Sequence, residues 1–286
     1  MFVSENTLIE NIYAMLSIFR HYNIVPIFVF DGKPPAEKKE LLQQRLAEKK
    51  TAEKEFNLLK TNLEYNSNMN EEEKHEIMNK MDILKKKFIY ISKSQIEIVK
   101  SLITNYGMTY CDAPNEADEL CAMLAVKGIV WSCLSEDMDM FLYGCPRVLR
   151  YMSLMNHTFV LYDTKKILNK IDITQDELRE ISVISGTDYN LNTHDHSQHN
   201  LFTTIKYFKK YKKNVSKAEN ISFYDWLKEN TNYLEKYDIE TYEMDMKMFL
   251  LYTNFYHYES ISICNKNIMK LEIQEILKKD GFIFPC

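Results

Sequence analysis

Three short apolar segments of this chain are each followed by an acidic residue, with at most one residue in between. They cover residues 24–30, 108–111 and 129–134, and each has the length of a buried β-strand. Helical patterns separate these segments. Strands that alternate with helices form right-handed βαβ units around a mainly parallel sheet. We therefore predict an α/β fold in which helices flank the sheet.

The overall composition is that of an ordinary globular protein. The chain has 286 residues, a net charge of −5 and 45% hydrophobic residues. No apolar run approaches the ~20 residues of a membrane helix, and no secretory signal is recognisable, so we expect no membrane partner. The six cysteines form no C-x-x-C pair, which disfavours a zinc site or a disulfide framework. These features favour an intracellular location, with nucleus, cytoplasm and a viral source all left open.

Five carboxylates follow the three predicted strands. Asp31 ends the first strand, Glu116 and Asp118 open the helix after the second, and Asp137 and Asp139 follow the third. Because the carboxyl ends of parallel strands meet at one edge of a sheet, we expect the five side chains to gather there. Such a gathering is electrostatically costly unless cations neutralise it, and oxygen ligands favour Mg²⁺ or Mn²⁺. Two such ions are a common device for phosphodiester cleavage.

Each of these acids also has a purely structural interpretation. Asp31-Gly32 is a common turn pair. Glu116 and Asp118 suit the positive end of a helix dipole, and Asp137 and Asp139 can be ordinary loop residues. The joint pattern is what favours a metal site.

Two long charged segments occupy residues 36 to about 105, with a break near 65–68. Apolar residues are too sparse there to bury both helices, so we predict a projecting helical arch. After residue 163 the pattern is entirely helical. A second basic cluster lies within that part and consists of Lys206, Lys209, Lys210, Lys212 and Lys213.

Four motifs together resemble the signature blocks of the flap endonuclease family, the XPG-type structure-specific 5′ nucleases. They are "VFDGKPPAEKKELLQQR", "YCDAPNEADELCAML", "SEDMDMFLYG" and "ISGTDYN", in the family's order over roughly residues 1–210. The resemblance implies a PIN-like fold and a nuclease that cuts branched or 5′-flap DNA in replication or repair. It also implies two Mg²⁺ ions, for which Mn²⁺ can substitute. The metal ligands that it implies are Asp31, Glu116, Asp118, Asp137, Asp139 and Asp188.

The resemblance assigns the basic residues to DNA. Lys38 and Arg45 would contact the scissile phosphate, and their seven-residue spacing puts them on one helix face. The arch would thread or clamp a single-stranded 5′ end. Lysines provide sequence-independent contacts to phosphates. The lysines expected to bind DNA at a junction of single and double strands are Lys93, Lys206, Lys209, Lys210 and Lys212.

The sequence departs from the family pattern in two places. A glycine-rich hairpin expected after Asp188 is replaced by residues 190–200, where His194, His196 and His199 suit either a transition metal or a polar surface loop. The family also begins with a central strand that ends in one further ligand Asp. Neither that strand nor a clear sliding-clamp peptide is recognisable. Three explanations for the missing strand stay open: it is encoded upstream of Met1, a separate N-terminal polypeptide completes the sheet as a partner, or the chain is a relative that only binds nucleic acid.

Two domains are expected. Residues 1–163 would form the nuclease core with its arch, and residues 164–286 would form a helical region that completes the active site and binds duplex DNA. Two functional alternatives stay open beside the flap nuclease. One is a 5′→3′ exonuclease or junction resolvase, and the other is an inactive relative that only binds nucleic acid.

Overall fold

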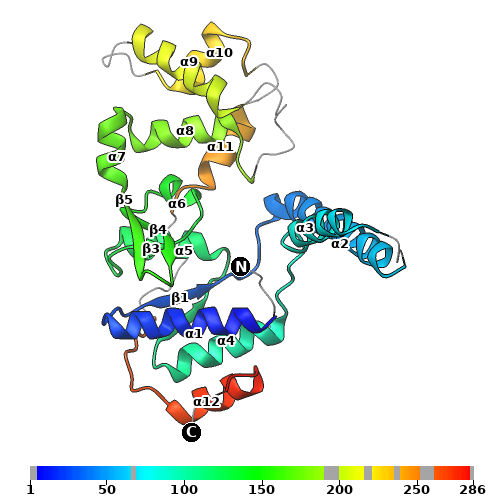
Figure 1. Ribbon diagram of the computed structural model, residues 1–286. Helices are drawn as coiled ribbons and strands as arrows, with labels where there is room; N and C mark the ends of the chain where they lie inside the picture. The colour runs from blue at the N-terminus through cyan, green and yellow to red at the C-terminus, as the bar shows by residue number, and fades with distance from the viewer. Residues whose placement is uncertain are drawn as a thin grey trace. The chain divides into compact units, whose positions relative to one another are not determined.

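A computed structural model describes residues 5–65, 69–189, 200–215, 221–234, 239–251 and 261–283. The chain forms two compact units (Figure 1). The first comprises Met1–Phe28, Lys39–Tyr110 and Ile263–Cys286, and the second comprises Val29–Lys38 and Cys111–Ser262. No helix in the described ranges is both long and apolar enough to cross a membrane.

The first unit is built from helices. Its core lies where α4 packs against α1 and α12, and Leu16, Leu102 and Ile103 are fully buried there. A hydrogen bond of 2.8 Å joins the hydroxyls of Ser17 and Tyr106 beside this core. The helices are α1 (Glu5–His21), α2 (Lys39–Tyr65), α3 (Glu71–Lys85), α4 (Lys93–Asn105) and α12 (Lys270–Lys279).

The predicted arch is shorter than the sequence suggested. The charged stretch forms three helices, because the side chain of Ser92 accepts a hydrogen bond from the Gln95 backbone and starts a new helix, α4. That helix buries Val99 in addition to Leu102 and Ile103, so it belongs to the packed core. The expected arch over 36–105 is thus corrected to α2 and α3.

Helices α2 and α3 bury little, as their charged sequences predict. Among the described side chains, α2 buries only Leu41 and Ala52, and α3 buries none. Phe56 on α2 makes an edge-to-face contact with Phe88, three residues after the end of α3, with ring centroids 5.4 Å apart. Asn70 begins α3 with a capping box. Figure 1 shows the two helices side by side.

The C-terminal residues belong to the first unit. The backbone N–H of Lys266 donates to the Gly107 carbonyl over 2.9 Å, and that of Met269 donates to the Asn105 carbonyl over 2.8 Å. Gly107 has φ of +71°, and a Cβ there would lie 2.3 Å from the Lys266 carbonyl oxygen. The units therefore do not follow the predicted division at residue 163, because Ile263–Cys286 belong to the same unit as the N-terminal residues.

Five strands lie in two sheets within the described residues. Strands β1 (Ile27–Phe30) and β2 (Thr109–Asp112) form one, and the boundary between the units runs through both strands. Strands β3 (Cys133–Leu134), β4 (Arg147–Ser153) and β5 (Thr158–Asp163) form the other. β3 pairs in parallel with β4, and β4 pairs antiparallel with β5. The α/β class is confirmed, although one continuous, mainly parallel sheet is not formed by these residues.

In the second unit, the helices next in sequence to β3 and β5 pack against these strands, while the later helices pack mainly on one another. Val148, Phe223 and Phe249 are fully buried in its core. The buried Glu180 carboxylate accepts hydrogen bonds from the Tyr242 hydroxyl at 2.8 Å and the Phe223 backbone, which ties three helices together. The elements are a 3₁₀ turn (Ala36–Lys38), α5 (Ala117–Val126), α6 (Asp139–Leu142), α7 (Thr164–Ile171), α8 (Gln175–Ser185), α9 (Leu201–Asn214), α10 (Phe223–Asn230) and α11 (Ile239–Lys247).

Candidate active site

Asp31 is held at the beginning of helix α5. Strand β1 ends at Phe30, whose carbonyl accepts a hydrogen bond of 2.8 Å from the Ala113 backbone. One oxygen of the Asp31 carboxylate then accepts a 2.9 Å hydrogen bond from the Ala117 N–H. Ala117 is the first residue of α5, so Asp31 satisfies one of the free N–H groups of that helix. The side chain predicted as a metal ligand is thereby fixed beside the other acids of α5.

Gly32 allows this approach because it has no side chain. Its N–H donates to the Asn115 carbonyl over 2.7 Å. A Cβ at Gly32 would lie 1.9 Å from the Ala113 carbonyl oxygen, which is far inside contact distance. Gly32 is not among the glycines with positive φ, so its role is close packing and not an unusual turn conformation.

Asp118, Asp137 and Asp139 are linked through one serine. Ser135 directly follows β3, and its hydroxyl donates to Asp118 at 3.2 Å and accepts from the Asp137 backbone at 3.1 Å. Asp137 in turn accepts a 2.8 Å hydrogen bond from the Asp139 backbone. Sequence reasoning missed Ser135, although its position at the end of the strand in "SEDMD" was a usable signal.

The loop of residues 135–139, here called the acidic loop, is held from strand β4. The Arg150 guanidinium donates to the Glu136 carbonyl at 2.7 Å and also contacts the Met138 sulfur. The Glu136 side chain accepts a 2.6 Å hydrogen bond from the Tyr151 backbone. Arg150 therefore fixes the segment that carries Asp137 and Asp139.

Lys38, Glu116, Tyr189 and Tyr143 form a connected set of contacts. The Lys38 ammonium is 2.8 Å from one oxygen of Glu116, and the Tyr189 hydroxyl donates to the other oxygen at 2.6 Å. The Tyr143 and Tyr189 hydroxyls are 3.1 Å apart. Lys38 also lies 4.6 Å from the centre of the Tyr189 ring. Sequence reasoning missed both tyrosines; Tyr189 directly follows Asp188, which was the available signal.

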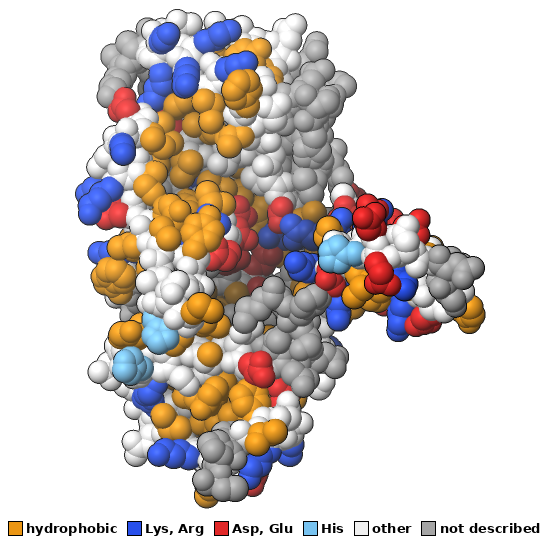
Figure 2. Space-filling model, in the orientation of Figure 1, with side chains coloured by type: hydrophobic (Ala, Val, Ile, Leu, Met, Phe, Trp, Pro, Cys, Tyr) orange, Lys and Arg blue, Asp and Glu red, His pale blue; other side chains and the backbone are white. Residues whose placement is uncertain are grey.

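Burial and, in part, the charges of the other four predicted ligands raise the pKa values of Asp118 and Asp139. Burial, together with the charges of Asp137, Asp31 and Glu116, raises the pKa of Asp118 to about 6. Burial also raises the pKa of Asp139 to about 7, with Asp137, Asp188 and Asp118 adding repulsion and Lys38 opposing it. Figure 2 shows acidic side chains gathered beside α5 and α6. The structure thus brings together all six carboxylates in the second unit.

The carboxylates suit a hard divalent cation by their chemistry. Among the residues that the structure describes, no group of three or more His, Cys, Asp or Glu side chains is arranged to hold a metal ion. Hydrogen-bond donors and Lys38 engage the carboxylates of Asp31, Glu116, Asp118 and Asp137. Oxygen donors with uncompensated negative charge are nevertheless the ligands that Mg²⁺ and Mn²⁺ prefer. The residues therefore fit such an ion in type.

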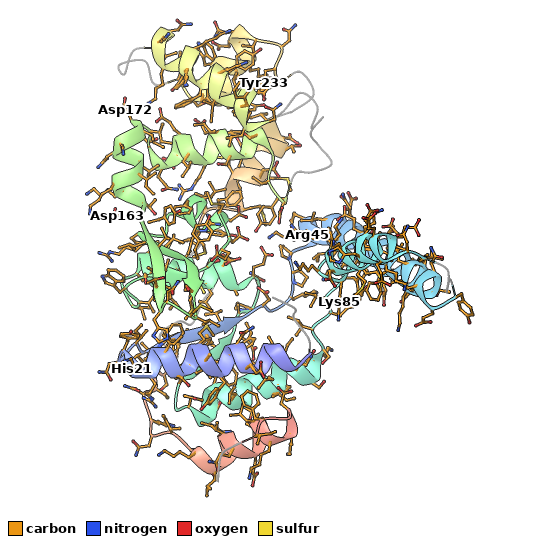
Figure 3. The ribbon with its side chains drawn as sticks, in the orientation of Figure 1. His21, Arg45, Lys85, Asp163, Asp172 and Tyr233 are labelled. Carbon is orange, nitrogen blue, oxygen red and sulfur yellow. The ribbon has the colours of Figure 1, made fainter. Side chains whose placement is uncertain are left out.

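The structure does not place the second predicted phosphate contact in this unit. Arg45 is exposed on α2, in the first unit, and Figure 3 labels it there together with Lys85 at the end of α3. Lys93 is exposed at the start of α4, in the same first unit. The joint action of Lys38 and Arg45 on one phosphate stays a prediction.

Helix α9 presents most of the second basic cluster to solvent. Lysines line a cavity of about 390 Å³ on this helix, and Figure 2 shows basic side chains gathered over it. Lys212 differs, because its ammonium is 2.6 Å from the Glu177 carboxylate and it contacts the Phe208 ring. His194, His196 and His199 lie outside the described residues. The cavity is lined by Thr203, Lys206, Tyr207, Lys209, Lys210 and Lys213.

Sequence comparison identifies two matching domains. The profile of the XPG N-terminal domain matches residues 2–52, and that of the XPG I-region matches residues 107–188. The second match includes five of the six clustered carboxylates, and the first includes the sixth, Asp31.

The chain is also similar to curated proteins named flap endonuclease 1. The chain is 32% identical over 168 residues to flap endonuclease 1 of Methanococcus aeolicus, covering 59% of this chain and 48% of that protein. It is 30% identical over 190 residues to flap endonuclease 1 of Sulfurisphaera tokodaii, covering 62% and 51%. The chain therefore spans about half the length of the curated relatives that it matches.

Solved structures share the fold at low sequence identity. The catalytic core of Rad2 has a TM-score of 0.63 at 17% identity, covering 96% of this chain and 82% of that one. Flap endonuclease-1 from Methanococcus jannaschii has a TM-score of 0.52 at 21% identity, covering 94% and 80%. Human GEN1 in complex with Holliday junction DNA has a TM-score of 0.57 at 18% identity, covering 95% and 60%.

Proposed function

We propose that the chain is a metal-dependent, structure-specific nuclease of the XPG family, because its residues 2–52 and 107–188 match the XPG N-terminal domain and I-region and the curated relatives named above are flap endonucleases. It would hydrolyse phosphodiester bonds in branched or 5′-flap DNA during replication or repair. The observation that carries this proposal is the cluster of six carboxylates, in which burial and the neighbouring acids raise the pKa of Asp118 and Asp139, beside a lysine in contact with Glu116.

The residues that would hold two Mg²⁺ or Mn²⁺ ions are Asp31, Glu116, Asp118, Asp137, Asp139 and Asp188. Such ions, when bound, activate water and stabilise the charge of the leaving oxygen. Asp118 and Asp139 must be ionised to act as ligands, and their raised pKa values place this ionisation near neutral pH. The cluster would therefore take up cations most readily above pH 7.

Lys38 would neutralise the phosphate that is cut. Its ammonium is largely buried, with 13% of the side chain exposed, and lies at the edge of the carboxylate cluster through its contact with Glu116. A fixed positive charge in a partly dry site stabilises a phosphate transition state more strongly than one in water. Arg45 would add a second positive charge from helix α2.

The helices would bind the rest of the substrate. On α9, Lys206, Lys209, Lys210 and Lys213 are exposed and adjacent, which suits the backbone phosphates of a duplex. The charged helices α2 and α3 would contact the single strand, and Lys93 would lie on a DNA-binding surface as well. An intracellular compartment, nucleus or cytoplasm, would suit the free thiols of Cys121, Cys133 and Cys145.

Cleavage assays decide between the candidate activities. Flap, nicked, gapped and four-way DNA would be incubated with the protein in Mg²⁺ or Mn²⁺. Preferential cutting of flaps supports the proposal, whereas stepwise products or symmetric cuts in four-way DNA support the exonuclease or the resolvase. Binding without cleavage of any of the four substrates would support the inactive relative and defeat the enzyme proposal.

Single substitutions test the cluster itself. We expect Asp137→Asn and Asp139→Asn to lower the cleavage rate by a factor on the order of 10³ while leaving DNA binding largely intact. Asp172→Asn is a matched control, because Asp172 ends α7 with φ of 53°, a conformation that Asn tolerates well. Figure 3 shows Asp172 at the end of that helix. Normal cleavage by either active-site variant would remove that residue from the site.

A further inference from the structure

Tyr189 is the one aromatic side chain that contacts both Lys38 and Glu116 among the contacts described above. Its hydroxyl donates a 2.6 Å hydrogen bond to Glu116. The face of its ring lies 4.6 Å from the Lys38 ammonium. Glu116 and Lys38 are themselves 2.8 Å apart, so the three side chains form a closed triangle.

The hydroxyl of Tyr189 is oriented by a second tyrosine. Tyr189 is 8% exposed and Tyr143 is 3% exposed, so neither hydroxyl can rely on bulk water. Since the Tyr189 proton points to Glu116, Tyr143 donates in the 3.1 Å contact between the two hydroxyls. This gives a buried chain of hydrogen bonds that runs from Tyr143 through Tyr189 to Glu116. Tyr143 lies at the end of α6, four residues after Asp139.

We propose that Tyr189 is a positioning residue that sets the geometry of both Glu116 and Lys38, an inference that rests on the nuclease function proposed above. The Tyr189 hydroxyl holds one oxygen of Glu116, and the Lys38 ammonium holds the other. A divalent cation bound by Glu116 would compete with Lys38 for that second oxygen, and the Tyr189 ring would then keep the ammonium beside the site through a cation–π contact.

The competing explanation is that Tyr189 only fills space. Its ring packs against Phe249 with centroids 5.4 Å apart, and Phe249 is fully buried. A space-filling role predicts that Tyr189→Phe, which keeps the ring and removes only the hydroxyl, changes stability and nothing else. The positioning role predicts specific changes at Glu116 and Lys38.

The first experiment needs neither metal nor DNA. The rate at which an amine-reactive reagent labels Lys38 is measured by peptide mass spectrometry in the full chain. We expect Tyr189→Leu, which removes both ring and hydroxyl, to speed labelling of Lys38 by about fivefold or more, since a partly buried cation–π contact is lost. Thermal unfolding shows whether Tyr189→Leu folds. If it does not fold, Tyr189→Phe replaces it, and we expect a smaller increase in the rate of Lys38 labelling.

The second experiment measures Mn²⁺ affinity by calorimetry without DNA. We expect Tyr189→Phe to weaken Mn²⁺ binding about tenfold, because the partner that orients a ligand carboxylate is lost. Tyr242→Phe is the matched control, since its hydroxyl also donates to a buried carboxylate, that of Glu180, at 2.8 Å. Tyr143→Phe should lie between the control and Tyr189→Phe.

The outcomes separate this inference from the nuclease proposal. Suppose that the unmodified chain cleaves none of the DNA substrates but that Lys38 is labelled faster in Tyr189→Leu. This result would defeat the nuclease proposal and leave the positioning role standing. Cleavage by the unmodified chain, with unchanged Lys38 labelling and unchanged Mn²⁺ affinity in the Tyr189 variants, would overturn the positioning role alone. An equal loss of Mn²⁺ affinity in Tyr242→Phe would also overturn it, because the effect would then be general.

Discussion

Gly32 offers a test of the site at the scale of one residue. A Cβ at Gly32 would lie 1.9 Å from the Ala113 carbonyl oxygen. The Cβ is bonded to the backbone and the oxygen is part of it, so neither atom can move away without a backbone shift. We expect Gly32→Ala to lower the free energy of unfolding by about 1–3 kcal/mol and to displace Asp31 from α5, with a large loss of cleavage. Urea unfolding and a cleavage assay measure the two effects.

Gly128 supplies the control for that substitution. It has φ of +73°, and a Cβ there would meet no atom within 4 Å. Gly128→Ala should therefore cost about 1–2 kcal/mol through backbone conformation alone and keep cleavage intact. If Gly32→Ala cuts as well as Gly128→Ala, the close contact does not position Asp31.

The raised pKa values of Asp118 and Asp139 predict a pH dependence. The folded protein holds these protons up to about pH 6 and 7, whereas ordinary Asp releases them near 3.8. The folded state therefore binds more protons than the unfolded state in this window, so these two groups make the free energy of unfolding fall as pH rises from about 4 to 7. Above pH 7, bound divalent ions should restore the free energy of unfolding that is lost when these groups ionise.

Asp139→Asn isolates this contribution. Urea unfolding in a chelator at pH 5 and pH 8 should show a smaller fall in stability for the variant than for the unmodified chain. Equal falls would show that Asp139 ionises normally in the folded protein.

At the scale of elements, strand β4 controls the acidic loop through Arg150. We expect Arg150→Met to remove the charged hydrogen bond to the Glu136 carbonyl and to lower the cleavage rate about tenfold, as Asp137 and Asp139 lose their fixed positions. Arg147→Met is the matched control on the same strand. Arg147 donates to the Trp131 carbonyl and stacks on its ring, so this variant should lose stability but not cleavage. Equal cleavage by the two variants would contradict the positioning of the loop.

Helix α9 is expected to bind DNA through one group of lysines only. Each of Lys206→Ala and Lys210→Ala should weaken duplex binding and reduce the salt dependence of the affinity by about one counterion. Lys212→Ala should leave that slope unchanged, because Lys212 pairs with Glu177 and is part of the packing between α8 and α9. Fluorescence anisotropy at several salt concentrations separates these cases. A reduced slope for Lys212→Ala would place it on the DNA as well.

At the scale of the whole molecule, the two units have separate cores. Leu277 is fully buried on α12 in the first unit, and Leu227 is fully buried on α10 in the second. We expect Leu277→Ala and Leu227→Ala each to cost about 2–5 kcal/mol. Hydrogen exchange should show the loss of protection mainly in α4 and α12 for the first variant and in α8 to α11 for the second. Uniform loss throughout the chain in both would indicate one cooperative unit.

Much of the site follows from local sequence patterns. Acids placed at strand ends and in the first turn of a helix predicted five of the six carboxylates, because backbone direction alone decides where those positions lie. The sixth, Asp188, was implied only by the family resemblance. Asn70, Ser92 and Thr174 cap helix starts in the structure, and the start at Ser92 is a local signal that the predicted arch did not use. The sparse apolar residues of α2 and α3 predicted two poorly buried helices. The α/β class, most of the carboxylate cluster and the exposed helices were thus determined by the sequence itself.

Tertiary structure decided the contacts between residues that are distant in the chain. Tyr189 and Glu116 are 73 positions apart, and the C-terminal residues near Lys266 return to Gly107. The placement of α4 in a core and of Lys212 against Glu177 also depends on partners that no local pattern names. Local patterns set backbone conformation and the faces of each element, whereas the choice of partner depends on how those faces pack. Tyr189 is therefore a neighbour of Lys38 and Glu116 because of tertiary packing and not because of any local pattern.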